Sequence, residues 1–232
     1  LREVPENQPF MATSCCPAWS VMAKKEFPGM APYISMTMTP MVLTARLMKR
    51  RNPGCKIAFI GPCAAKKLEA SRRTIRSDVD FVLTFEELRG MFEAKGIDFS
   101  QIPNTPANYE ASAPGVGFAA SGGVAAAVEG IIKQKHPELE VKTVYAEGLK
   151  ECRQMLRMAR TGKYDGYLLE GMACPGGCIA GAGVVQPPEK SKRVLEQYKK
   201  AAPLSSPLDS AYVEDIYLIH EDPEEWGSVS HH

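Results

Sequence analysis

Five of the seven cysteines in this 232-residue chain lie in three short segments, and these segments hold the residues best suited to chemistry. They are Thr13-Ser14-Cys15-Cys16-Pro17, Gly61-Pro62-Cys63-Ala64-Ala65-Lys66-Lys67 and Met172-Ala173-Cys174-Pro175-Gly176-Gly177-Cys178. Each joins cysteine to proline or glycine, and such loops let a backbone approach a bulky inorganic group while thiolates point inward. Because soft sulfur ligands select iron–sulfur clusters or zinc over hard cations, the pattern predicts one of these two sites.

The spacing of the cysteines favours a cluster over zinc. Structural zinc sites usually take their ligands in two close pairs, whereas Cys16 and Cys63 stand apart in separate motifs and only Cys174 and Cys178 are close. A 4Fe-4S cube requires four thiolates, which these motifs supply. A single buried cysteine is ordinarily inert packing, but four in three such motifs indicate ligands.

Composition excludes several classes of partner. The net charge is +1, from 28 Lys and Arg against 27 Asp and Glu, so no overall field attracts nucleic acid or anionic membrane. Apolar stretches such as residues 122–132 are too short to cross a bilayer. The unevenly spaced cysteines do not resemble a secreted disulfide framework, so we expect a soluble protein of a reducing, cytoplasmic compartment.

The elements that must position the motifs alternate between apolar strands and helices. Strands are predicted at residues 56–60 (short and buried), 80–84, 140–145 and 164–169, the last leading into the third motif. Helices are predicted at 17–27, 39–51, 85–95, 123–133 and 149–161, and residues 98–117 are predicted to be a surface loop. This order predicts an α/β fold of two packed lobes, with mainly parallel sheets flanked by helices and the cluster site in the cleft between them.

The motifs resemble the catalytic domain of the iron-only (di-iron) hydrogenases. The signatures of that family are Thr-Ser-Cys-Cys-Pro-Gly-Trp, Met-Pro-Cys-x-x-Lys-Lys and Met-Ala-Cys-Pro-Gly-Gly-Cys, and all three occur here in order. The resemblance covers roughly residues 9–188 and includes residues 80–84, 117–124 and 148–149. It implies an H-cluster, which is a 4Fe-4S cube linked to a di-iron subcluster with carbonyl, cyanide and dithiolate ligands.

Position by position, the resemblance assigns the cluster ligands. It makes Cys16, Cys63 and Cys174 ligands of the cube, and makes Cys178 both a ligand and the bridge to the di-iron subcluster. It makes Cys15 a free thiol that passes protons to and from the dithiolate. A thiol has an unperturbed pKa of about 8.5, so its surroundings can tune it to donate and accept protons near neutral pH. A disulfide between Cys15 and Cys16 would be strained and improbable in a reducing compartment.

Further residues are assigned by their positions in the motifs. Ser35 falls where the family places the next hydroxyl of its proton route, and Thr39 falls where a further serine is usual. Because Thr39 precedes Pro40, it is predicted first of all to cap a helix. The remaining assignments are Lys66, which would hydrogen-bond a cyanide ligand; Met172, which would pack beside the di-iron unit; and Ser14 and Ala65, which would line the same cavity. Cys55 and Cys152 match no motif and are predicted to be buried structural thiols.

The chain departs from the family pattern at several positions. Gly61 replaces the methionine usual in active members, which is expected to open one wall of the pocket. Ala18 replaces a glycine of the first motif, and Ala182 with Val184 and Val185 alters the end of the third. Such changes resemble those of divergent members thought to sense hydrogen.

The ends of the chain are expected to belong to a larger protein. Leu1 is not a methionine, and the family has further catalytic-domain sequence before the first motif, so residues 1–202 are interpreted as part of a catalytic domain. Residues 203–232 are interpreted as a tail ending in Ser230-His231-His232, a possible remnant of a purification tag. The implied partners are a ferredoxin or ferredoxin-like domains as electron donor, and H-cluster maturation proteins.

Three functions fit this sequence. The first is reversible reduction of protons to hydrogen with electrons from a ferredoxin-like donor. The second is hydrogen sensing with low turnover at the same site, which Gly61 favours. The third is a role in iron–sulfur cluster assembly without the di-iron unit, against which Cys15, Met172 and Cys178 argue.

Overall fold

Two parallel sheets organise the molecule. The computed structural model describes residue 4 and residues 7–103 and 110–214. The strands of this part are β1 (Met11–Ala12), β2 (Ala58–Ile60), β3 (Phe81–Leu83), β4 (Lys142–Glu147) and β5 (Tyr167–Met172). One sheet has the order β1-β5-β4 and the other pairs β2 with β3, and every pairing is parallel.

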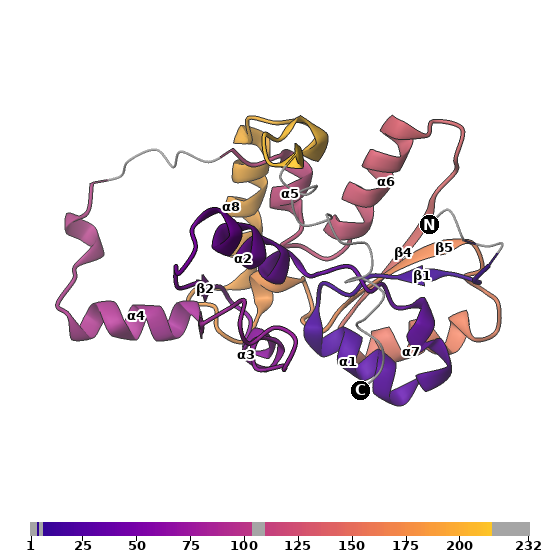
Figure 1. The fold of residues 1–232 in the computed structure, drawn as a ribbon, viewed down its shortest axis with the longest axis horizontal. Helices are drawn as coiled ribbons and strands as arrows, with labels where there is room; N and C mark the ends of the chain where they lie inside the picture. Colours follow the sequence, from indigo (N-terminus) through magenta and orange to yellow (C-terminus); the bar gives the residue numbers. More distant parts are fainter. Residues whose placement is uncertain (1–3, 5–6, 104–109, 215–232) are drawn as a thin grey trace.

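Helices cover both sheets, which confirms the predicted α/β class with parallel sheets flanked by helices (Figure 1). The α-helices are α1 (Pro17–Glu26), α2 (Pro40–Arg51), α3 (Ala65–Ala70), α4 (Phe85–Ala94), α5 (Ala113–Gly117), α6 (Gly123–Lys135), α7 (Leu149–Ala159) and α8 (Pro188–Ala201). Short 3-10 turns are η1 (Pro28–Tyr33), η2 (Phe99–Gln101), η3 (Cys178–Ala180) and η4 (Pro207–Asp209). Figure 1 shows α1 and α7 on one face of the larger sheet and α6 on the other.

The larger sheet has its own hydrophobic core. Trp19 of α1 is fully buried and packs with Phe10, Leu156 and Leu169. Its indole occupies the space beside Gly171 of β5, where an added Cβ would lie 2.2 Å from the ring. The Trp19 Nε1 donates to the Thr13 carbonyl at 2.9 Å, so the same side chain also fixes the start of the first cysteine motif.

The smaller sheet packs on a second core. This core is formed by Met41, Val42, Ala45, Ile57 and Val79, mainly from α2 and the segments before each strand. The prediction of a buried strand at 56–60 is wrong in burial, since Ile60 is 44% exposed and the neighbouring strand exposes Phe81 by 60%. A two-stranded sheet with one covered face leaves alternate side chains in solvent, and only the covered face joins the core.

Several elements depart from the sequence prediction. The predicted loop at 98–117 contains η2 and α5, where the Ser112 hydroxyl caps α5 by accepting the Gly115 N–H at 3.1 Å. Neither β1 nor α8 was predicted, because β1 has only two residues and α8 lies in a polar, lysine-rich stretch. The tail packs on α5 through the Ala113 N–H to the Leu204 carbonyl, while the histidines at the end lie outside the described residues. No helix in the described ranges is long and apolar enough to cross a membrane.

Replacing Gly171 by alanine tests the packing of Trp19. The new Cβ would overlap the indole, so we expect Gly171→Ala to lower the free energy of unfolding by about 1–3 kcal/mol. Gly130→Ala in α6 is the control, because a Cβ added there would have no neighbour within 4 Å and alanine favours helix by about 1 kcal/mol. Urea unfolding followed by circular dichroism measures both, and equal stability of the two variants would contradict the packing argument.

Candidate functional site

All three cysteine motifs follow the carboxyl ends of strands. The first comes directly after β1, the second after β2 and the third after β5. Because β1 and β5 are parallel neighbours, their loops emerge at the same edge of the larger sheet. The second motif comes from the other sheet, so the site draws its thiols from both sheets.

Hydrogen bonds join the first and third motifs directly. The Thr13 N–H donates to the Leu169 carbonyl at 2.9 Å, which continues the β1–β5 pairing into the first motif. Beyond it, the Ala173 N–H donates to the Cys16 Sγ at 3.4 Å. One cysteine sulfur of the first motif therefore lies against the backbone immediately before Cys174.

The segment after Cys178 joins the third motif to the second. The Gly183 N–H donates to the Pro62 carbonyl at 2.9 Å, and Gly181 lies so close to this carbonyl that a Cβ would be 2.5 Å from its oxygen. Gly177, at φ +88, lies equally close to the backbone of residues 119–121. These approaches explain why Gly177 and Gly181 are glycines, since a side chain at either position would separate the loops.

The four predicted ligand thiols are within electrostatic reach of one another. Burial raises the pKa of Cys178 to about 11, with further contributions from Cys16, Cys63 and Cys174. Burial likewise raises the pKa of Cys174, again with contributions from Cys16 and Cys63. In the described part of the chain, no three His, Cys, Asp or Glu side chains are close enough to hold a single metal ion. Four thiols from three loops that influence one another in this way suit the ligand set of a cluster.

Unpartnered hydroxyls also fit a bound group. Buried polar atoms are normally hydrogen-bonded, yet Thr13 Oγ1, Thr39 Oγ1 and Ser121 Oγ are buried without a partner. Thr13 belongs to the first motif, and Ser121 borders Gly177 of the third. Thr39 occupies the N-cap position of α2 but its side chain caps nothing, so the predicted helix cap is wrong.

Cys15 is a free thiol whose neighbours favour its protonated form. Burial, followed by the carboxylate of Glu170 and the thiols of Cys16 and Cys178, raises the pKa of Cys15 to about 12, against an opposing effect of Lys66. In the absence of a bound group the Cys15 sulfur therefore holds its proton at neutral pH. Proton exchange near neutral pH would require a bound group to lower this pKa, because an acid–base group works best when it titrates near the operating pH.

Glu170 is a buried carboxylate that sequence reasoning missed. It is fully buried in β5 and accepts the N–H groups of Gly122 at 2.9 Å and Ala125 at 2.7 Å, at the start of α6. Burial raises the pKa of Glu170, opposed by these backbone hydrogen bonds. An acidic residue within an otherwise apolar strand could have indicated a buried carboxylate. The predicted strand ended at residue 169, one residue before Glu170, so this signal was not seen.

Lys66 lies beside the first motif but is already paired. It is 8% exposed and its Nζ lies 2.6 Å from Oε2 of Glu69, which is 2% exposed, and 3.4 Å from the Cys15 carbonyl oxygen. Its cation therefore reaches the Cys15 segment, as the prediction requires, with Glu69 as a counter-ion that the motif alone did not indicate. The spacing of three residues along a helix could have indicated the pair.

The other predicted site residues are distributed around the motifs. Met172 is 3% exposed at the end of β5, and Ala65 is the first residue of α3, two residues after Cys63. The Ser14 hydroxyl donates to the Thr37 carbonyl at 3.2 Å. The Ser35 hydroxyl donates to Thr37 Oγ1 at 2.9 Å, so this bond is to the neighbouring loop rather than to Cys15.

Two expectations for the second motif and the outlying cysteines need correction. The space beside Gly61 is not open, because the ring of Phe59 fills it and would lie 2.8 Å from an added Cβ. Cys152 is fully buried as predicted, with its thiol near the carbonyls of Ala146 and Met172. Cys55 is only half-buried, because it lies in the turn after α2 at the margin of the second core.

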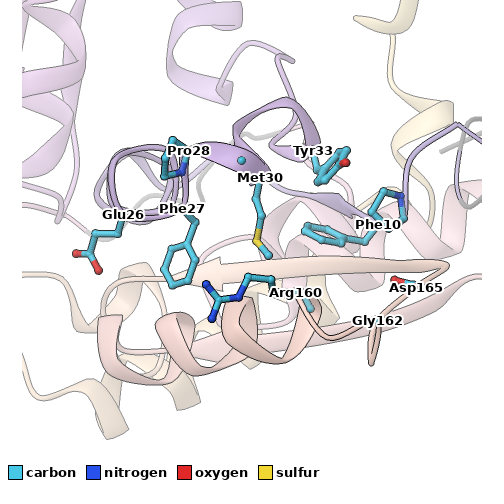
Figure 2. A pocket seen from close by; sticks show the side chains of 12 residues that line it. Phe10, Glu26, Phe27, Pro28, Met30, Tyr33, Arg160, Gly162 and Asp165 are labelled. Carbon is cyan, nitrogen blue, oxygen red and sulfur yellow. The ribbon is translucent and has the colours of Figure 1, made fainter.

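A separate cavity of about 570 Å³ lies away from the cysteines, between η1 and the end of α7 (Figure 2). Figure 2 shows the Met30 side chain between Phe27 and Phe10 at this cavity, with Arg160 across from them. None of its lining residues is a predicted site residue. The cavity is thus distinct from the candidate cluster site.

Fold and thiols together define an α/β protein with an iron–sulfur type of site assembled from three loops. The family model "Iron only hydrogenase large subunit, C-terminal domain" matches residues 1–182, and the chain belongs to this family. The match includes all three cysteine motifs.

The relatives of known function fall into two groups. The chain is 30% identical over 212 residues to the large subunit of a periplasmic [Fe] hydrogenase of Nitratidesulfovibrio vulgaris, covering 74% of this chain and 50% of the relative. It is also 30% identical over 263 residues to a probable cytosolic Fe-S cluster assembly factor of Drosophila virilis, covering 89% of this chain and 55% of the relative. The chain thus spans about half the length of each.

Solved structures share the fold. A variant of the [FeFe]-hydrogenase HydA1 from Chlamydomonas reinhardtii matches with a TM-score of 0.71 at 18% identity, covering 90% of this chain and 71% of that one. An apo form of the same hydrogenase, also a variant, matches with a TM-score of 0.69 at 21% identity, covering 94% and 72%. At this identity the likeness describes the fold.

The buried pair of Lys66 and Glu69 can be tested by removing one partner. We expect Lys66→Met to lower the free energy of unfolding by about 3–5 kcal/mol, because Glu69 would be left buried without a counter-ion. Adding Glu69→Leu should restore most of that loss, since no isolated charge would remain. Thermal unfolding of the metal-free protein measures both, and a double variant no more stable than Lys66→Met would contradict the pairing.

The raised pKa of Cys15 predicts slow alkylation. A shift from 9.0 to about 12 reduces the thiolate fraction near pH 8 about a thousandfold, so iodoacetamide should modify Cys15 far more slowly in the folded metal-free protein than in urea. Because the unfolded thiol ionises first, this group lowers the stability of the fold as pH rises above about 9. Peptide mass spectrometry at timed intervals measures the rate, and equal rates in both states would refute the shift.

Proposed function

We propose that this domain binds an H-cluster and supports the reversible reduction of protons to molecular hydrogen. Cys16, Cys63, Cys174 and Cys178 would hold the 4Fe-4S cube, and Cys178 would also bridge to the di-iron subcluster. The observation that carries the proposal is the joining of the three cysteine motifs, through the Ala173 N–H to the Cys16 Sγ and the Gly183 N–H to the Pro62 carbonyl, together with a free thiol at Cys15. Membership of the hydrogenase family supports it.

The residues of the chain divide the work between them. When bound, the H-cluster supplies the redox-active metal on which hydrogen is formed or split. Cys15 would hold a proton at its Sγ and deliver or accept it. The hydrogen-bonded hydroxyls of Ser35 and Thr37 would be the next groups of the proton route. Lys66 directs a cation toward the Cys15 segment and would stabilise anionic ligands there. Met172, Ser14 and Ala65 would line the cavity.

Electrons would come from a ferredoxin or a ferredoxin-like domain, because the cysteine motifs supply ligands for one cluster only. Insertion of the di-iron subcluster would require maturation proteins. The uneven cysteine spacing and the cytosolic relatives support a cytoplasmic location.

A role in cluster assembly is the second candidate, and the probable assembly factor among the relatives is the observation that favours it. In that case the chain would hold an iron–sulfur cluster without the di-iron subcluster, and Cys15 would have no proton to transfer. Hydrogen sensing is a variant of the first proposal, with the same site and low turnover, and the departures from the family motifs at Ala18 and Ala182 favour it.

Cluster loading distinguishes these functions. The protein is reconstituted anaerobically with iron and sulfide, loaded with a synthetic di-iron complex and examined by infrared spectroscopy. We expect bound carbonyl and cyanide bands that Cys178→Ala abolishes and Cys15→Ser keeps, with hydrogen evolution from reduced methyl viologen falling at least about a hundredfold in Cys15→Ser. Cys55→Ala, outside the motifs, is the matched control and should change neither.

Each other outcome has a meaning of its own. A reduced 4Fe-4S signal without bound carbonyl bands would favour the assembly function. Bands that respond to hydrogen with little turnover would favour sensing. Failure to take up any cluster would overturn the proposal.

A further inference from the structure

Among the residues that the structure describes, the loop between Cys174 and Cys178 donates one hydrogen bond to a side chain outside the motif. The Gly176 N–H donates to Oε2 of Glu147 at 3.0 Å. Within the loop, the Gly177 N–H donates to the Cys174 carbonyl at 3.0 Å. Gly176 and Gly177 both have positive φ, near +90°, so the loop has little intrinsic preference for this shape.

The end of the larger sheet fixes Glu147 beside this loop. Glu147 is the last residue of β4 and pairs with Met172 in β5. The next residue, Gly148, donates its N–H to the Met172 carbonyl at 2.8 Å and turns the chain at φ +86. The carboxylate is therefore held by two strand ends, only a few residues from Cys174.

We propose that Glu147 is a positioning residue for the cluster, which holds the Cys174–Cys178 loop in its ligand-presenting shape and lowers the reduction potential of the bound cube. This inference rests on the proposed 4Fe-4S site and extends it to a residue outside the cysteine motifs. No step of the proposed proton transfer uses Glu147.

Two physical effects follow from the contact. A hydrogen bond from an amide to a carboxylate is charge-assisted, so it restrains a glycine-rich loop more than a neutral acceptor would. The contact also holds a carboxylate against the backbone of the loop and engages the Gly176 N–H, which then cannot donate to a cluster sulfur. A nearby negative charge and a missing hydrogen bond to sulfur both favour the oxidised cluster, because cluster potentials depend on net charge and on hydrogen bonds to sulfur.

Glu151 provides a matched control. Its Oε2 lies 2.7 Å from the position of a Cβ on Gly148, and Pro175 Cγ lies 3.8 Å from the same point. This carboxylate is therefore near the same loop, but within the described part of the chain the loop amide of Gly176 donates to Glu147 instead. Glu151→Gln removes one negative charge in this neighbourhood and leaves the bond to Gly176 in place.

The first experiment is hydrogen–deuterium exchange of the metal-free protein, read on a peptide covering residues 173–181. Glu147→Ala should raise amide exchange at Gly176 at least about tenfold, because the amide loses its acceptor. Glu147→Gln should raise it less, since the glutamine carbonyl can still accept, and Glu151→Gln should leave it unchanged. Equal exchange in all four proteins would overturn the positioning role.

The second experiment is a potentiometric titration of the reconstituted 4Fe-4S cluster, followed by electron paramagnetic resonance. The midpoint potential should move to more positive values in Glu147→Ala, which loses both the charge and the acceptor, by less in Glu147→Gln, which keeps an acceptor, and by clearly less in Glu151→Gln. Equal shifts in Glu147→Ala and Glu151→Gln would show that Glu147 acts only as a nearby charge, and would overturn the inference about its hydrogen bond.

The two experiments separate this inference from the proposed function. If the unmodified protein takes up no cluster, the proposed function fails, while the exchange measurement still decides whether Glu147 holds the loop. If the cluster forms and neither exchange nor potential responds to Glu147, the inference fails and the cluster site stands.

Discussion

The backbone contact between Pro62 and the Gly181–Gly183 segment holds together two halves that otherwise have separate cores. One core surrounds Trp19 and the other surrounds Val42, and each serves its own parallel sheet. The hydrogen bond from Gly183 to Pro62, with the close approach of Gly181, joins the loop after Cys178 to the loop that carries Cys63. Together with the hydrogen bond from Lys66 to the Cys15 carbonyl, this contact fixes the thiols of the two sheets relative to one another, as a four-thiolate site requires.

Carboxylates recur around the candidate site. Glu170 is bonded to the start of α6, Glu69 pairs with Lys66, and Glu147 accepts from the third motif. Glu69 and Glu170 are buried, whereas Glu147 is half-buried. Each acid has defined partners, so each restrains backbone or side chains near the cysteines rather than acting as an isolated charge. The site therefore combines three thiols whose pKa is raised by burial in the metal-free protein, at Cys15, Cys174 and Cys178, with carboxylates that already have partners.

The sequence predicted the parts of this arrangement that depend on local spacing. The cysteine motifs, the helix begun by Pro17 and the α/β class follow from residues close together in the chain. Glu170 was missed because its importance comes from tertiary neighbours, whereas Glu69 lies three residues after Lys66 and could have been found from that spacing. The expected open wall at Gly61 was wrong for a related reason: a missing side chain leaves space only if no neighbour fills it, and Phe59, on the same strand, does. The prediction that the strand at residues 56–60 is buried failed because the burial of a strand depends on how many strands join its sheet.

The pairing of β1 with β5 has a consequence for how this molecule forms. Met11 and Leu168 are partners in one sheet, whereas β2 and β3, with the helix α2 that covers them, are complete within residues 40–83. The smaller half is thus an insertion between the two ends of the larger one. During synthesis the smaller half can fold early through local contacts. Cys15 and Cys16 can take their final positions only after β5 has been synthesised and has paired with β1. The four ligand thiols can therefore assemble at one site only after β5, the last strand to be synthesised, has joined its sheet.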